Sequence, residues 1–521
     1  MLSLFQRLKA RRWVRRCLWS LFIFLGLLLL VWQCVNWKGA RELAHAKEML
    51  AADGESLDLH EIMPDPIPDA ENFCAIPLLK DFLVESAPID GEGEPSERAK
   101  RFKAACLPKG NDSATQPRFG QGAAVGRPTD LKAWAEWLKK FGSVPLSEGS
   151  EDPAHAVLAA LSKDDALLGE LAAGLNRPHA QWTPAWKSRK LPEDVSSLEL
   201  TRFSPLWNFT KMLQLRSIAA ARAGDAAKAH EALQIAIKLN QAGEKEPFLI
   251  GLLVAQSSAG EIAHSVWEVC DAHAGNVDDF RALGLALSQL DFEKAALLAV
   301  RTETVFERDS MVRTKKNPAL LFATIHMHAT PDPGPWQAPE SLLIPGGWLD
   351  MNLATFLRWQ HDFEMKPLRD GGFRALVDQQ SVLESTIQQF KVHPFAHLDA
   401  ILPEVVIGGV GMGVRSAAYT QCLLNQATVA CALECYRIEN QSYPETLEAL
   451  ALPNGKALPL DVLTGKPMGY RRSAPNHYTL WCAGFDEKDD GGKRVSDEKN
   501  PERTRFNRIG YKGDWVWDFP E

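Results

Sequence analysis

A continuous apolar run near the N-terminus is the strongest pattern in the chain. Residues 17–35 read CLWSLFIFLGLLLLVWQCV, which is 19 residues without a charge. As a helix this run extends roughly 28 Å, close to the hydrocarbon thickness of a bilayer at about 30 Å. Tryptophans, which favour the headgroup region, flank or cap the run (Trp13, Trp19, Trp32 and Trp37). The pattern predicts a transmembrane helix over 17–37 that continues as a helix through 39–52.

The charges beside this run predict its orientation. Six Lys or Arg and no acidic residue precede it, so the positive-inside rule places residues 1–16 in the cytoplasm. A cleaved signal peptide is the alternative, because Ala44-His45-Ala46 has the form of a cleavage site. That site lies well past the apolar run, and the run is longer than the usual signal core of about 7–15 residues. We therefore expect an uncleaved single-pass anchor, with most of the chain beyond the membrane.

Helical periodicity dominates the middle of the chain. Between residues 130 and 400, apolar positions recur at i, i+3, i+4 and i+7 in several segments, which predicts a helical domain. Two Ala-rich runs, 210–223 and 225–239, meet at a turn where Asp225 is placed to cap the second helix. Small residues allow the two helices to approach closely (Ala219, Ala220, Ala223, Ala227 and Ala229). This hairpin resembles a tetratricopeptide unit, although no 34-residue repeat is evident.

Segments rich in Pro and Gly separate these regions. Residues 38–129 read as an extended or linker region with short helices, and they end in a Gly/Pro/Ser/Asn-rich loop at 108–129. Residues 330–347 interrupt the helical pattern again. The Gly-rich stretch 408–413 lacks the register of a nucleotide-binding loop and reads as a hinge before the last region.

The pattern changes once more after residue 410. An amphipathic helix is expected over 416–439, and a strand is expected over 478–481. An acidic, Gly-flanked loop follows the strand, and the sequence DWVW lies close to the end of the chain. The predicted fold class is therefore mainly α, with a small C-terminal α+β module over 410–521.

Composition and charge narrow the classes of function. Hydrophobic residues make up 45% of the chain and charged residues 24%, values that exclude a disordered or multi-span protein. Seven of the 58 basic residues lie before residue 39, so the remainder carries 51 basic against 66 acidic groups, a net charge of −15. A body this acidic repels phosphate backbones, so nucleic acid is not an expected partner. Basic partners or divalent cations suit it better.

The chain carries few motifs of catalysis or metal binding. G-x-S-x-G, H-E-x-x-H, CxxC and Walker sequences are all absent. His326 and His328 have a spacing that can chelate a metal, but no carboxylate lies close in sequence, so we expect a pair at a loop or helix end. Cys74 and Cys106 are the favoured disulfide if the compartment is oxidising. Cys431 and Cys435 share a helix face and are expected to be small buried residues rather than zinc ligands.

Sixteen tryptophans are many for this length, and some of them are candidates for stacking on sugars. Core packing is the more common role for such residues. The candidates are Trp134, Trp137, Trp182, Trp186, Trp207, Trp267, Trp336, Trp348 and Trp359.

The order of elements after residue 416 is the most specific signal. A helix ends in Tyr436-Arg437, Tyr443-Pro444 opens a loop, and a D-x-x-x-G-x-P-x-x-Y stretch spans 461–470. A strand with an acidic loop follows. This order resembles the C-terminal globular domain of the major pseudopilin of type II secretion systems, over residues 416–517. The N-terminus has no prepilin-peptidase site, so we expect a reused module rather than a pseudopilus subunit.

The resemblance implies a candidate calcium site. In that family the acidic loop binds calcium, and by position the candidate ligands here are Asp486, Asp489, Asp490, Asp497 and Asp514. Several carboxylates in a Gly-flanked loop also suit a cation that takes six to eight oxygens. The loop does not fit an EF-hand, because Lys488 occupies the third position and a strand precedes it. A solvated acidic hairpin loop is the alternative.

The whole chain resembles a group of uncharacterised bacterial envelope proteins with a single anchor, a helical middle and a pseudopilin-like end. The resemblance implies a protein of the inner membrane whose bulk is periplasmic. We expect a non-enzymatic scaffold that binds other envelope proteins. The alternative is an envelope enzyme or glycan-binding protein with a site at the Trp-rich loops.

Overall fold

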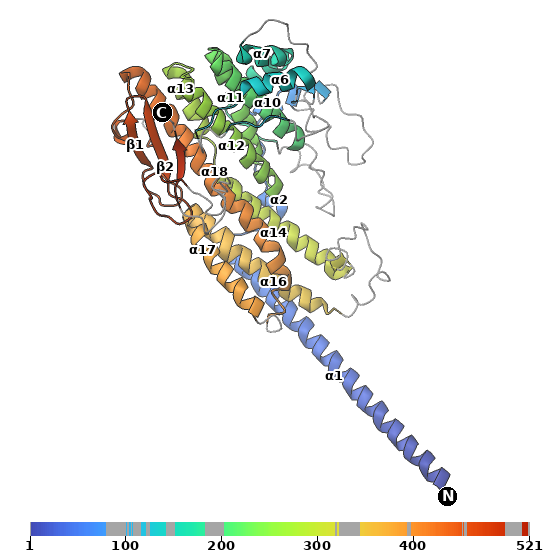
Figure 1. Cartoon of the computed structure of the whole chain (residues 1–521). Helices are drawn as coiled ribbons and strands as arrows, with labels where there is room; N and C mark the ends of the chain where they lie inside the picture. The colour runs from blue at the N-terminus through green and yellow to red at the C-terminus, as the bar shows by residue number, and fades with distance from the viewer. Residues whose placement is uncertain are drawn as a thin grey trace. The chain divides into compact units, whose positions relative to one another are not determined.

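The computed structural model places the elements of the chain in two compact units. It describes residues 2–79, 100–101, 104–105, 107, 116–120, 126–141, 152–182, 203–317, 320–321, 344–392, 397–450, 452, 456–494 and 513–518. The first unit comprises Met1–Leu57, Thr304–Phe363 and Val382–Gly409, and the second comprises Asp58–Glu303, Glu364–Ser381 and Val410–Glu521. The fold is mostly helical with one small antiparallel sheet near the C-terminus (Figure 1), as predicted.

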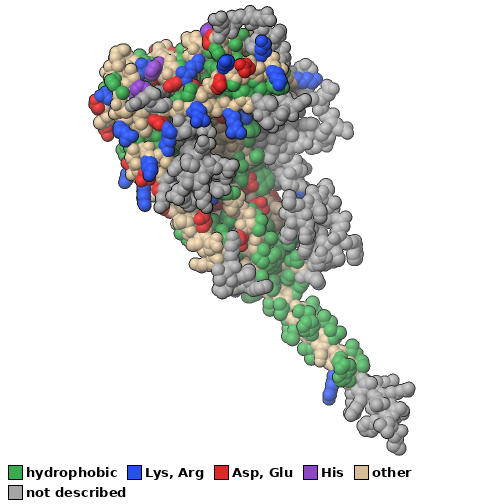
Figure 2. Space-filling view, viewed as in Figure 1, with side chains coloured by type: hydrophobic (Ala, Val, Ile, Leu, Met, Phe, Trp, Pro, Cys, Tyr) green, Lys and Arg blue, Asp and Glu red, His purple; other side chains and the backbone are tan. Residues whose placement is uncertain are grey.

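The first unit contains one 51-residue helix, α1 (Leu2–Ala52). Its apolar segment is exposed, with Phe22 75% and Leu29 70% accessible, and Figure 2 shows hydrophobic side chains all along it. The last turns of the same helix are packed, because Ala46 and Leu50 are buried. The predicted continuation of the apolar helix through 39–52 is therefore confirmed.

Helix α1 packs closely on α16 (Gly346–Gln360) through glycine. A Cβ at Gly39 would lie 2.0 Å from the carbonyl oxygen of Gly347, so the two backbones touch and tolerate no side chain there. Asn36 Oδ1 accepts a hydrogen bond from Gly347 N at 2.7 Å, and Arg358 pairs with Glu42 at 2.9 Å. The buried side chains of Trp359, Leu383, Ala400 and Ile407 form an apolar cluster in the same unit.

The second unit contains most of the shorter helices. They are α2 (Leu59–Ile62), η1 (Phe73–Ala75), α6 (Leu131–Phe141), α7 (Pro153–Leu161), η3 (Ser162–Asp164), α8 (Asp165–Ala172), α10 (Phe203–Arg222), α11 (Ala226–Gly243), α12 (Leu249–Asp271), α13 (Val277–Leu287) and η8 (Leu447–Ala449). The helices α14 (Phe292–Lys316), α17 (Lys366–Val392) and α18 (Ile401–Asn440) and the π-helical turn η6 (His361–Met365) contribute residues to both units.

Helices α10 and α11 form the predicted hairpin. Gly224 takes a positive φ of 79° at the turn, a conformation that favours glycine, and Asp225 caps α11 by accepting from Lys228 N at 3.1 Å. Ala219, Ala220 and Ala229 are fully buried where the helices meet. The hairpin is confirmed, and its resemblance to a tetratricopeptide unit stays a prediction.

Helix α18 includes the predicted helix 416–439 but starts much earlier, at Ile401. The prediction of a hinge at 408–413 is wrong, because these residues lie inside the helix. Two of the glycines leave room for side chains of neighbouring helices rather than bending the chain. A Cβ at Gly413 would lie 2.9 Å from Leu249 Cδ1, and a Cβ at Gly411 would lie 3.1 Å from Gln380 Oε1. Packing therefore overrides the weak helix preference of glycine here.

Two helices among the described residues are long and apolar enough to cross a bilayer, and they differ in burial. The apolar window of Trp13–Ala52 has a mean hydropathy of 2.3 and is 0% buried. The window in α18 has a mean hydropathy of 1.3 and is 44% buried within the protein. We interpret α18 as a core helix, so the expectation of a single anchor rests on α1.

The sheet at the C-terminus has three antiparallel strands in the order β1–β2–β3. They are β1 (Gly469–Ala474), β2 (His477–Cys482) and β3 (Trp515–Asp518). Leu480 pairs with Tyr470 on one side and with Trp517 on the other. Gln426 of α18 donates to the carbonyl of Trp515 at 2.7 Å, so the helix lies against β3. The predicted strand and the small sheet are both confirmed.

The carboxyl group of Glu364 is fully buried in the second unit. Arg415 and Gln380 are its polar neighbours, and Arg415 Nη1 donates to Gln380 Oε1 at 3.2 Å. Burial raises the pKa of Glu364 to about 8, although the charge of Arg415 lowers it in part. The folded protein therefore holds a proton on Glu364 that the unfolded chain releases near pH 4.5.

This proton makes stability depend on pH in a predictable direction. Because the pKa of Glu364 is higher in the folded protein than in the unfolded chain, protonation of this group favours the fold. This stabilisation is fully present below about pH 4.5 and is lost as the pH rises through about 8. We expect the unfolding free energy of the wild type, relative to Glu364→Gln, to fall by up to about 1.4 kcal/mol per pH unit between these values. Urea denaturation from pH 5 to 8.5 measures the difference, with Glu439→Gln as an exposed control. A difference that is flat across this range would contradict the assignment.

Candidate functional site

The acidic loop after β2 is held by its own N–H groups. Asp514 is fully buried and accepts from Asp490 N at 3.2 Å and from Gly492 N at 2.7 Å. Asp489 accepts from the indole of Trp481 at 2.8 Å and from Gly491 N at 2.9 Å. Both carboxylates therefore fix the loop to the sheet.

The candidate calcium ligands gather only in part. Burial raises the pKa of Asp514, and the charges of Asp489 and Asp490 raise it further, so these three carboxylates lie near one another. Asp486 accepts from Lys488 N at 3.5 Å, and Asp497 lies outside the described residues. Over the part of the chain that the structure describes, no three His, Cys, Asp or Glu side chains form a group able to hold a metal ion. The calcium site stays a prediction.

Most of the candidate tryptophans pack in the interior. Trp134, Trp137, Trp182, Trp267 and Trp359 are buried, as expected for core residues. Trp348 is partly buried and donates to the Leu398 carbonyl at 2.7 Å, whereas Trp207 is 36% exposed. Trp186 and Trp336 lie outside the described residues.

The predicted histidine and cysteine pairs give mixed outcomes. His326 and His328 lie outside the described residues, as does Cys106. Cys74 is a buried thiol, and because Cys106 is not described, the bridge between them stays a prediction. Cys431 is buried and Cys435 is partly buried, which agrees with their interpretation as small packing residues.

A cavity of about 430 Å³ lies beside helix α12 in the second unit, and we call it the α12 cavity. Its walls come from the described part of the 108–129 loop, from α6, from α10 and from α12. The residues with aromatic or polar side chains that matter most are Phe119, Trp134, Lys211, Gln214, Glu261 and His264. Part of a predicted functional loop and one predicted tryptophan thus meet at a single cavity.

Glu261 is the titratable group of most interest in this cavity. Burial raises the pKa of its carboxyl to about 7, although the charge of Lys211 and a hydrogen bond from Trp207 lower it in part. Trp207 Nε1 donates to Glu261 Oε1 at 3.1 Å, and the Lys211 ammonium lies 3.9 Å from the centre of the Trp207 ring. Near neutral pH this group therefore exchanges between a donor and an acceptor form.

A polar network on the same helix holds His264 at the cavity. His264 Nε2 lies 3.1 Å from Thr129 Oγ1 and 3.3 Å from Glu268 Oε1. Glu268 also accepts from Thr129 N and from Arg222, at 2.5 and 2.8 Å. Burial opposes ionisation of Glu268, but these hydrogen bonds lower its pKa. The network therefore fixes the imidazole and ties the loop at Thr129 to α12.

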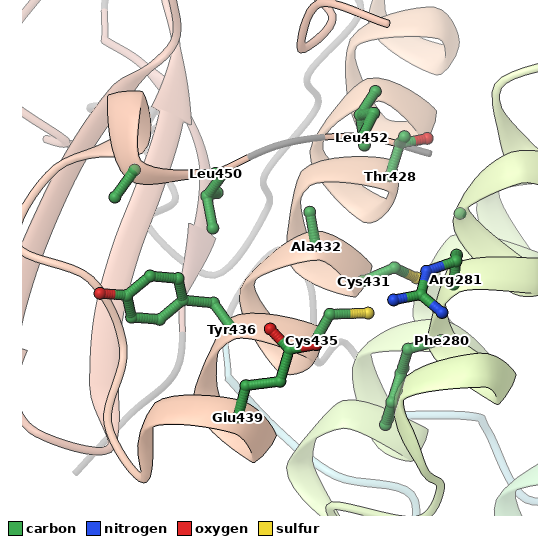
Figure 3. Close-up of a pocket in the computed structure, with 12 residues that line it drawn as sticks. Phe280, Arg281, Thr428, Cys431, Ala432, Cys435, Tyr436, Glu439, Leu450 and Leu452 are labelled. Atoms are coloured by element: carbon green, nitrogen blue, oxygen red, sulfur yellow. The ribbon is translucent and has the colours of Figure 1, made fainter. Parts of the chain in front are cut away.

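A second hollow, of about 320 Å³, lies between α13 and α18, and we call it the α13/α18 groove. Figure 3 shows Cys431 and Cys435 of α18 pointing toward Arg281 of α13, while Tyr436 points away from α13. Apolar side chains line part of it (Phe280, Ala432, Leu450 and Leu452). The groove borders the predicted pseudopilin-like module on its helical side.

Sequence reasoning missed the polar residues of the α12 cavity. Glu261, His264 and Glu268 recur at i, i+3 and i+7, so they lie on one face of a helix, and this spacing was a usable signal. Gln214 lies 47 positions away on another helix, and only packing brings it to the cavity.

Comparisons with known proteins add no assignment. No protein-family model matches the chain, and neither a curated protein nor a solved structure matches it.

The acidic loop makes a prediction about stability and calcium. Asp514→Asn replaces an acceptor of two backbone N–H groups, so we expect the unfolding free energy to fall by about 1–3 kcal/mol. Urea denaturation in a chelator measures the loss, with Asp486→Asn as a milder control. Because the Asp489 and Asp514 oxygens already accept from N–H donors, we expect calcium to leave the wild-type midpoint unchanged. A calcium-dependent rise that disappears in Asp514→Asn would contradict this and establish the site.

Proposed function

We propose that this protein is anchored by one helix in the bacterial inner membrane and binds other envelope proteins through its extracytoplasmic body. On this proposal the pseudopilin-like module at the C-terminus is the part that contacts partners. The protein works by assembly rather than by catalysis.

Helix α1 carries the proposal. One unbroken helix has an apolar window that is 0% buried and a following part that packs on α16. Exposed leucine and phenylalanine over this length are costly in water and favourable in lipid, at about 25 cal/mol per Å². Basic residues precede the apolar run, which supports a cytoplasmic N-terminus.

The C-terminal module supports the second half of the proposal. A long helix followed by a three-stranded antiparallel sheet agrees with the order of elements in the pseudopilin globular domain. The α13/α18 groove lies at this module and combines an apolar lining with Arg281 and Glu439. We expect a protein segment with an apolar face and charged flanks to bind there.

Site-specific photo-crosslinking in intact cells tests this proposal. A photoreactive residue at Ala449 or Glu439, both exposed at the groove, is expected to capture the same envelope protein reproducibly. Lys228, exposed on α11, is the matched control position. Truncation at residue 415 is a poor substitute, because it removes buried residues of α18 such as Ala427 and Ala430. Equal capture at the groove and control positions, or none at either, would argue against the proposal.

Protease accessibility tests the proposed orientation of the protein in the membrane separately. Protease added to intact spheroplasts is expected to digest the body of the full-length protein, whereas a cytoplasmic body would stay protected until the membrane is permeabilised.

A second function, glycan binding or an enzyme acting on glycans, is supported by the α12 cavity. Phe119 and Trp207 are the partly exposed aromatic side chains near it, and sugars commonly stack on such rings. Glu261 and Gln214 supply oxygens that accept hydroxyl protons. Trp182, a candidate from the sequence, is only 3% exposed, so its substitution would test folding rather than binding.

Titration with maltotriose and chitotriose tests this second function. Because ionised Glu261 accepts hydrogen bonds from sugar hydroxyls, we expect affinity in the wild type to rise as the pH increases through about 7. Glu261→Gln is expected to remove that pH dependence, and Trp207→Ala to weaken binding about tenfold, the loss of one stacking contact. Calorimetry measures both, with Tyr436→Ala in the other groove as the control. No binding by either sugar would exclude this function.

A further inference from the structure

One face of helix α18 lies against the sheet at β3. Tyr419 and Gln426 are seven positions apart and share this face. The Tyr419 ring lies 5.2 Å from the Trp515 ring, and Gln426 Nε2 donates to the Trp515 carbonyl at 2.7 Å. Cys422 is three positions after Tyr419 and four before Gln426, so it lies on the same face.

The register of the sheet brings a second cysteine to this place. Trp515 of β3 pairs with Cys482 at the end of β2. The next residue, Ala483, donates its N–H to Asp461 Oδ2 at 2.8 Å, which fixes the end of β2. The helix face and the strand end thus meet where Cys422 and Cys482 lie.

The two thiols are buried and in contact. Both cysteines are free, Cys422 is fully buried, and Cys482 is 1% exposed. Each thiol lies close enough to perturb the pKa of the other, and the helix face and strand end described above bring them to the same place. A disulfide needs two cysteines from neighbouring elements, and the packing of α18 against the β2–β3 edge supplies such a pair.

We propose that Cys422 and Cys482 form a disulfide that links helix α18 to strand β2 in the mature protein. The proposal is independent of the predicted Cys74–Cys106 bridge, which stays a prediction because Cys106 lies outside the described residues. It rests on the extracytoplasmic location proposed above, because such a bond persists in an oxidising compartment.

The reaction balances with a disulfide as the oxidant. One cysteine, as thiolate, attacks the disulfide of an oxidised thiol donor, releases a donor thiol and forms a mixed disulfide. The second cysteine then attacks that mixed disulfide, releases the other donor thiol and leaves the Cys422–Cys482 bond. Two protons and two electrons pass to the donor in total. Burial raises the pKa of both thiols, so exchange is expected during folding rather than in the folded protein.

Peptide mapping tests the pairing. The full-length protein is refolded with oxidised and reduced glutathione, alkylated and digested with trypsin. Cys482 is the one cysteine of the tryptic peptide 473–488, and Cys422 lies in 416–437. We expect these peptides to be joined, with a mass two hydrogens below their sum. Their complete alkylation as separate peptides would overturn the pairing.

Serine variants identify the partner within 416–437, which also contains Cys431 and Cys435. Cys422→Ser is expected to abolish the joined species, and Cys431→Ser, a buried position on the same helix, is expected to keep it. A joined species that persists in Cys422→Ser would overturn the assignment.

Two further measurements separate this inference from the proposed location. A reductant is expected to lower the melting temperature of the oxidised wild type by several degrees and to leave the Cys422→Ser/Cys482→Ser double variant unchanged; an unmoved wild type would overturn the structural role. Alkylation at the moment of extraction from membranes is expected to give the joined peptides. If they form in glutathione but are absent from the membrane extract, the pairing stands and the proposed location is overturned.

Discussion

Burial of helix α18 is the interaction on which the C-terminal part of the second unit depends. Its inward positions carry small side chains, among them Ala417, Ala418, Cys422 and Ala427, all of them fully buried. Small side chains let the sheet and neighbouring helices approach the helix backbone at interior packing density. The same residues make α18 apolar enough to cross a bilayer by composition. Its burial within the protein is what distinguishes it from the exposed apolar part of α1.

Burial also determines the chemistry of the acidic residues inside this unit. Glu261 and Glu364 have few ionic partners, so desolvation raises their pKa values. Glu268 is as fully buried as Glu364, but His264, Arg222 and a backbone N–H hold its charge, and its pKa is lowered. The hydrogen bonds and charges around a buried carboxyl group, rather than burial alone, decide whether its pKa is raised or lowered. Glu261, whose pKa lies near neutral pH, therefore makes the α12 cavity a candidate site. Ionised Glu268 holds His264 and Thr129 in place beside it.

Helix α1 runs without a break from an exposed apolar part to a packed end. Its first part exposes apolar side chains on all sides, and its later part contacts α16 so closely that glycine is required at Gly39 and Gly347. A continuous helix with a packed end fixes the direction of its exposed apolar part relative to α16 better than a flexible linker would. Residues 39–52, the first part of the region predicted as a linker with short helices, therefore belong to α1.

The sequence by itself determined the elements whose signals are local. The helices over 210–239, the cap at Asp225, the helical conformation of 17–35 and the strand at 478–481 all depend on residues close together in the chain, and each was predicted correctly. The tertiary structure decided what depends on distant packing. The stretch 408–413 continues a helix in which Gly411 and Gly413 make room for neighbouring side chains, and Glu261 meets Gln214 and Trp207 only because α10 lies on α12. Likewise, Cys422 and Cys482 are 60 residues apart and lie at the same place only because α18 lies against the sheet. Contacts between distant residues follow from the summed packing of many side chains, which no local pattern records.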